Sequence, residues 1–111
     1  MIVELRRIAL ARSGDKGGHA NIGVWTHSDK LYEVLVREVS AERVAEHFAA
    51  FGPRSVERYE LRRLRALNFV LRDVLGVEGA AASLRTDAQA KTYSQGLLTL
   101  AVEVPEGLVD R

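Results

Sequence analysis

The sequence contains no cysteine among its 111 residues and only two prolines. The absence of cysteine excludes disulfide bonds, thiolate nucleophiles and cysteine-based metal sites, and it fits a reducing compartment. No apolar run is long enough for a signal peptide or a membrane span, because the N-terminal segment MIVELRR is charged from its fourth residue. We therefore expect a cytoplasmic protein that has no membrane partner.

An excess of one charge is also missing. Sixteen Lys and Arg residues face fifteen Asp and Glu residues, for a formal charge of +1. Nucleic-acid-binding proteins usually carry a clear basic excess, so we expect no nucleic-acid partner. With 47% hydrophobic and 28% charged residues, the composition is that of a globular protein. A chain of this length suits one core, and we predict a single domain over residues 1–111.

Segments with the period of strands and of helices follow one another along the chain. Strand patterns are found at residues 2–10, 20–26, 55–62 and 98–104, and helical patterns at 29–39, 40–52 and 64–76. A short strand at 83–87 and a short helix at 88–95 complete the prediction. Strands at both ends with helices between them predict an α+β fold, in which an antiparallel or mixed sheet carries helices on one face. The other face is left for solvent or a second subunit, and self-association is expected.

The segment between the first two predicted strands is rich in glycine. Gly14, Gly17 and Gly18 permit close approach of the backbone to a ligand, and consecutive backbone N–H groups in such a loop can bind an anion beside Lys16. The alternative is an ordinary solvated turn. The loop matches neither the P-loop nor the G-x-G-x-x-G pattern. Ser13 and Lys16 form S-x-x-K, but the flanking glycines disfavour the helical turn on which that catalytic pair depends.

The remaining polar residues give weaker signals. His19, His27 and His47 lack the spacing of metal ligands, so we predict no metal and no cofactor. Five arginines between residues 54 and 65 alternate with glutamates and indicate a salt-bridged surface. Asn68 lies in an apolar segment predicted to be helical, and residues 85–91 carry a polar stripe.

Several separate segments resemble one known family. ARSGDKG at 11–17, NIGV at 21–24, ALNFV at 66–70 and SLRTDAQAK at 83–91 are similar to the C-terminal domain of the acyclic terpene utilisation (AtuA-like) proteins. The resemblance implies a ferredoxin-like two-layer α+β sandwich. It also implies a setting in acyl-CoA and branched-chain or terpenoid acid catabolism. In that family the domain follows a larger N-terminal domain, so a separately encoded large AtuA-type subunit is an expected partner, beside a homo-oligomer.

The family's polar segments together predict one site. We expect an accessory or ligand-binding domain whose site takes an anionic small molecule and is formed by Arg12, Ser13, Gly14, Asp15, Lys16, Gly17, Asn21, Asn68, Arg85, Asp87 and Lys91. No catalytic residue is assigned. The alternatives are a small acyl-CoA enzyme of hydratase, isomerase or thioesterase type, with Asp15 or His19 as acid/base, and a structural subunit without a ligand.

Overall fold

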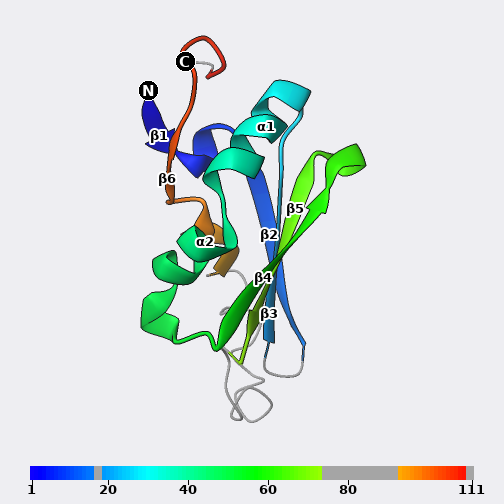
Figure 1. Cartoon of the computed structure of the whole chain (residues 1–111), viewed down its shortest axis with the longest axis vertical. Helices are drawn as coiled ribbons and strands as arrows, with labels where there is room; N and C mark the ends of the chain where they lie inside the picture. Colours follow the sequence, from blue (N-terminus) through cyan, green and yellow to red (C-terminus); the bar gives the residue numbers. More distant parts are fainter. Residues whose placement is uncertain (17–18, 74–92, 110–111) are drawn as a thin grey trace.

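The computed structural model describes residues 1–16, 19–73 and 93–109 (Figure 1). Its main sheet has four strands, which are β2 (Leu10–Lys16), β3 (His19–Trp25), β5 (Ala66–Arg72) and β4 (Ser55–Leu61), in that spatial order. All three pairs of neighbours are antiparallel. A smaller sheet pairs β1 (Ile2–Glu4) with β6 (Ala101–Glu103), so the two ends of the described chain lie side by side.

Each of the two α-helices begins after a serine whose side chain caps a free backbone N–H group. The Ser28 hydroxyl accepts from Leu31 N–H ahead of α1 (Asp29–Glu38), and the Ser40 hydroxyl accepts from Arg43 N–H ahead of α2 (Ala41–His47), both at 3.1 Å. The predicted interruption between the two helices is confirmed. A 3₁₀ turn, Ala49–Phe51, ends the second helix at Gly52, whose φ of 63° is the left-handed conformation that glycine adopts without strain.

The helices and the small sheet pack on one face of the main sheet (Figure 1). Ile22, Phe69 and Leu35 are fully buried between the two layers, and the hydrophobic core extends to Leu5 and Val104 of the terminal segments. The molecule is therefore a two-layer α+β sandwich with an antiparallel sheet, as the periodicity of the sequence predicted.

The prediction of one strand over residues 2–10 is wrong. The chain pairs with β6 only as far as Glu4 and then turns into a 3₁₀ helix, Leu5–Arg7, before β2 begins. The cause is a long-range contact, because the N–H groups of Leu5 and Arg6 donate to the carbonyls of Leu100 and Leu98 at 2.8 and 3.0 Å. These bonds hold the buried Leu5 side chain in the core at the point where the chain changes sheet.

The helix predicted over residues 64–76 is also wrong where the structure describes it. Residues 66–72 form the central strand β5, and a third 3₁₀ helix, Arg62–Leu64, precedes it. Leu67, Phe69 and Leu71 are fully buried, while the residues between them are only partly buried. Pairing on both sides, with β3 and β4, satisfies the backbone of this segment.

The predictions for the C-terminal third have mixed outcomes. The strand at 83–87 lies outside the described residues, as does most of the helix at 88–95, although residues 93–97 are helical. Leu98, Leu100, Val102 and Val104 are buried alternately, as predicted, but only 101–103 pair as a strand.

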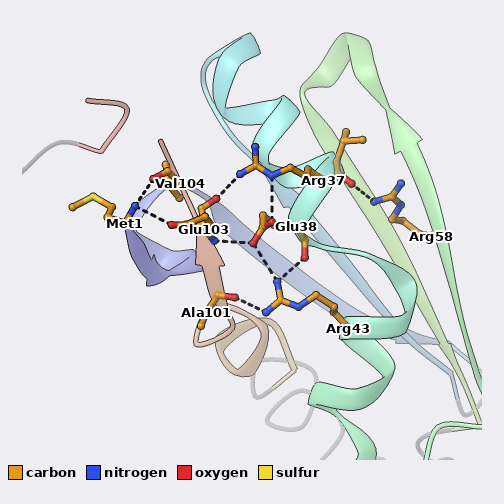
Figure 2. Close-up of polar contacts among 9 residues, drawn as sticks. Met1, Arg37, Glu38, Arg43, Arg58, Ala101, Glu103 and Val104 are labelled. Atoms are coloured by element: carbon orange, nitrogen blue, oxygen red, sulfur yellow. Dashed lines mark hydrogen bonds and ion pairs between the residues drawn. The ribbon is translucent and has the colours of Figure 1, made fainter. Parts of the chain in front are cut away.

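A polar network fastens the terminal strands to the helical layer (Figure 2). The Glu38 carboxylate accepts from Glu103 N–H at 2.7 Å, and Arg37 and Arg43 donate to the carbonyls of Glu103 and Ala101, both at 2.6 Å. Glu38 also forms ion pairs with both arginines. Its pKa is lowered, first by the bond from Glu103 N–H and then by Arg37 and Arg43. The network thus spans three segments that are distant in the sequence.

Candidate functional site

The candidate site is the face of the main sheet that the helices do not cover, which we call the open face. Side chains alternate along a strand and paired residues share a face, so the register assigns this face directly. Three of its rows cross β2, β3, β5 and β4: Leu10–Trp25–Ala66–Leu61, Arg12–Gly23–Asn68–Tyr59 and Gly14–Asn21–Val70–Glu57. Beyond the third row, Lys16 pairs with His19 and Arg72 with Ser55 on the same face.

Three of the predicted site residues meet on the open face. Arg12 on β2 and Asn21 on β3 are exposed, and Asn68 on β5 is half-buried. Gly23 separates Arg12 from Asn68, so no side chain stands between them. Among the residues that the structure describes, Arg12 forms no ion pair, and neither amide has a hydrogen-bonded side-chain partner. These groups are free to bind a ligand.

The neighbouring charges of the open face neutralise one another. Arg72 donates to both carboxylate oxygens of Glu57, at 2.8 and 3.1 Å, and the Tyr59 hydroxyl donates to the same carboxylate at 2.6 Å. These bonds hold the pKa of Glu57 down to about 2 and raise that of the Tyr59 phenol. Sequence reasoning missed this trio. The i, i+2 spacing of Glu57 and Tyr59 in a predicted strand was the signal that would have placed both on one face.

Ser13 does not belong to the open face. Its position in the register alternates with those of Arg12 and Gly14, and its hydroxyl accepts from the N–H of Ser94, one of the helical residues 93–97, at 3.1 Å. Ser13 therefore fastens the C-terminal segment to the sheet, and the prediction that it binds the anion is replaced by a structural role.

Replacing Ser13 with alanine is expected to lower the free energy of unfolding by about 1 kcal/mol, within the 0.5–2 kcal/mol typical of a lost capping bond. Chemical denaturation of the variant measures this loss. Binding of any anion is expected to be unchanged. An unaltered stability together with weakened anion binding would return Ser13 to the site.

The glycine-bracketed loop is corrected in its first half. Residues 10–16 form strand β2, in which Gly14 pairs with Asn21, Asp15 with Ala20 and Lys16 with His19. Backbone groups that pair in a ladder alternate in direction, so they cannot converge on an anion as those of a nest do. Gly17 and three further predicted site residues, Arg85, Asp87 and Lys91, lie outside the described residues.

Two of the three histidines, His19 and His47, have hydrogen-bond partners. His19 Nδ1 accepts from Asp73 N–H at 2.9 Å, and His47 Nε2 lies 2.8 Å from the carbonyl oxygen of Gly96. Within the described ranges, no group of three or more His, Asp or Glu side chains is arranged to hold a metal ion. The arginine-rich stretch forms the predicted salt bridges, with Arg58 to Glu60, Arg62 to Glu33 and Arg65 to Asp29.

A shallow hollow adjoins the apolar end of the open face. It has a volume of about 220 Å³ and is lined by Leu10 and Trp25 of the first row, by the chain at 6–9 and by Thr26 and His27. The first row of the open face is thus apolar, and the second and third rows are more polar.

A family model described as the AtuA ferredoxin-like domain matches residues 3–103, which is most of the chain. The chain belongs to the AtuA ferredoxin-like domain family. The fold of this AtuA ferredoxin-like domain is accordingly a ferredoxin-like sandwich, as the sequence resemblance implied. No curated protein and no solved structure matches the chain. In the parts of the AtuA-like chain that are described, no helix is both long and apolar enough to cross a bilayer.

Proposed function

We propose that this chain is an accessory domain that binds an anionic small molecule on the open face, with Arg12 as the residue that pairs with the anion. The observation that supports this proposal most directly is the charge of the open face. Arg12 is exposed and forms no ion pair within the described residues, whereas Glu57 and Arg72 neutralise each other. Among the side chains that the structure describes, Arg12 is therefore a cation of the open face without a carboxylate partner, and a carboxylate or phosphate group would complete it.

The surroundings of Arg12 suit a small planar anion. Asn68 lies two strands away in the same row, at about 10 Å between Cα atoms. A Cβ atom at Gly23 would meet only the Arg12 carbonyl oxygen, at 3.9 Å, so the space between the two side chains is open. A carboxylate there would accept from the guanidinium, while the amides of Asn68 and Asn21 would donate to its oxygens or to a neighbouring hydroxyl.

The proposal extends to the setting of the domain. The family supports a place in acyl-CoA and branched-chain or terpenoid acid catabolism, where ligands carry a carboxylate or the phosphates of coenzyme A. We include in the proposal a cytoplasmic location and a role beside a separately encoded large AtuA-type subunit. The proposed task is binding, because the one described carboxylate of these rows, that of Glu57, is already paired with Arg72.

Isothermal titration calorimetry with isovalerate and isovaleryl-CoA tests the function. Arg12→Gln is expected to weaken binding of these anions at least tenfold, because an interaction with a charged group contributes about 1.5–3 kcal/mol. The matched control is Arg63→Gln, since Arg63 is also exposed and forms no ion pair among the described residues. Its affinity is expected to equal that of the wild type. Equal losses in both variants, or no binding of either ligand by the wild type, would contradict the proposal.

A further inference from the structure

The open face also carries large apolar side chains that nothing in the described chain covers. Leu10 is 63% exposed, Tyr59 48% and Leu61 43%, and all three lie at the two edges of the face. The small or half-buried residues lie between them, on the central strands. In the first row the large side chains are Leu10, Trp25 and Leu61, and in the second row they are Arg12 and Tyr59 at the two edges.

We propose that a second copy of this chain covers the open face, stacked on it about a twofold axis that runs along the strands, between β3 and β5. This operation places β2 of one copy over β4 of the other and β3 over β5, in the same rows. Sheets that pack face to face keep their strands within about 30° of each other, which this axis permits.

At several positions a large side chain of one copy then lies over a small side chain of the other. In the first row Trp25 meets Ala66 of the second copy, and Leu10 meets Leu61. In the second row Gly23 meets Asn68, and in the third Gly14 meets Glu57, while Asn21 meets Val70 as the one polar–apolar match. Because an isologous interface must be complementary to itself, this reciprocal matching of sizes favours a second copy as the occupant.

The charges fit the same arrangement. In the second row Arg12 meets Tyr59 of the other copy, whose hydroxyl is bonded to the Glu57 carboxylate. The unmatched guanidinium thus lies against an aromatic ring and beside an anion, both of which attract it. The two Arg12 residues stand at opposite edges of the stack, so they do not repel each other at close range.

The other in-plane twofold axis, which runs across the strands, gives a poor fit. It would set the apolar first row against the third, and Leu61 would lie against the ionised Glu57 or its neighbours. Contact with a leucine would leave that carboxylate without a polar neighbour on the second copy, whereas the axis along the strands brings Arg12 of the second copy into the adjacent row.

The two glycines of the face support a role outside the single chain. Glycine inside a strand weakens it and often marks a place where another group approaches closely. A Cβ atom at Gly14 would meet no described atom within 4 Å, so the described part of one copy does not require glycine there. The same holds for Gly23, where the nearest atom is an ordinary contact away. A second copy that packs against both positions does require it.

The size of the face sets the expected strength. Four strands at about 4.8 Å and three rows at about 7 Å give a patch of roughly 300–400 Å² in projection on each copy, or about 600–800 Å² on both, which is below the roughly 1,000 Å² of a stable specific interface. The dimer is therefore expected to dissociate on dilution. An anion at Arg12 would lie between the copies, but the dimer does not rest on the proposed function.

Sedimentation velocity at about 10–500 μM, in a buffer without carboxylates, tests the dimer. The wild type is expected to pass from monomer to dimer over this range, and emission of its single tryptophan, Trp25, is expected to shift to shorter wavelength as the dimer forms. Gly23→Gln is expected to raise the dissociation constant at least tenfold while the chain stays folded. The control is Ile2→Gln, which removes a 72% exposed apolar side chain on β1, outside the open face. This substitution is expected to leave the dissociation constant unchanged.

Paired substitutions at positions 12 and 59 test the direction of the twofold axis. Arg12→Glu is expected to weaken the dimer, and adding Tyr59→Arg in the same chain is expected to restore it. The two positions are about 14 Å apart within one chain, too far for a direct bond, so a restored dimer requires contact between copies. A monomer at all concentrations, or a dimer that neither Gly23→Gln nor Arg12→Glu weakens, would overturn the proposal.

Discussion

Phe69→Ala is expected to lower the free energy of unfolding by about 3–5 kcal/mol, which is the typical loss for removal of a fully buried phenylalanine. Phe69 has no exposed surface and lies on β5, which pairs with strands on both sides. The neighbouring Val70 points to the open face and is only partly buried. Val70→Ala is therefore expected to cost less than about 1.5 kcal/mol, and urea denaturation of both variants measures the difference.

This pair of substitutions separates a strand from a helix. Adjacent residues of a strand lie on opposite faces, so the two losses should differ several-fold. A loss of similar size at both positions would contradict the assignment of β5 as a strand with one face in the core.

Glu38→Ala is expected to lower the free energy of unfolding by about 1.5–3 kcal/mol, because it removes an ionised acceptor from the network that holds β6. Glu103 N–H loses its partner, and the charges of Arg37 and Arg43 lose theirs. Glu38→Gln keeps an acceptor oxygen for Glu103 N–H, so its loss is expected to be smaller. Denaturation at pH 7 compares the three proteins.

The dependence on pH identifies the charge as the cause. The folded protein lowers the pKa of Glu38 below its ordinary value of 4.5. A lowered pKa means that the stabilisation is complete above about pH 4.5 and is lost as the pH falls through the folded value. The difference between the wild type and Glu38→Gln should therefore shrink on acidification below pH 4.5. A difference that stays constant from pH 7 to pH 3 would show that the charge has no part in it.

The helices could be predicted because their signals are local. Ser28 and Ser40 cap helices whose apolar residues recur with the helical period, and both caps are observed. The strand at 55–61 and the alternating burial from Leu98 to Val104 also follow from local pattern. In each case the segment and its immediate neighbours determine the conformation.

Two strands of the main sheet, β5 and β2, could not be predicted because their stability comes from distant partners. Leu64, Leu67 and Leu71 fit the spacing of a helix, and the half-buried Val70 hides the alternation of a strand. Residues 10–16 carry few apolar side chains, yet they pair along their whole length with β3. Pairing between strands supplies the hydrogen bonds that local propensity does not indicate.

Prediction of the candidate site depends on the same pairing between strands. Arg12, Asn21 and Asn68 were all predicted as site residues, but their common face appears only when 66–72 is a strand in register with β3. Ser13 was assigned to the site because it adjoins Arg12 in the sequence, and alternation along β2 places it elsewhere.

The most direct test of the open face as a binding surface is a ¹H–¹⁵N NMR titration of the wild-type chain with isovalerate. We predict the largest shift changes at the amides and side chains of Arg12, Asn21, Gly23 and Asn68, with none of comparable size in α1 or α2. Shift changes concentrated in the helical layer, or no change at millimolar isovalerate, would contradict the account.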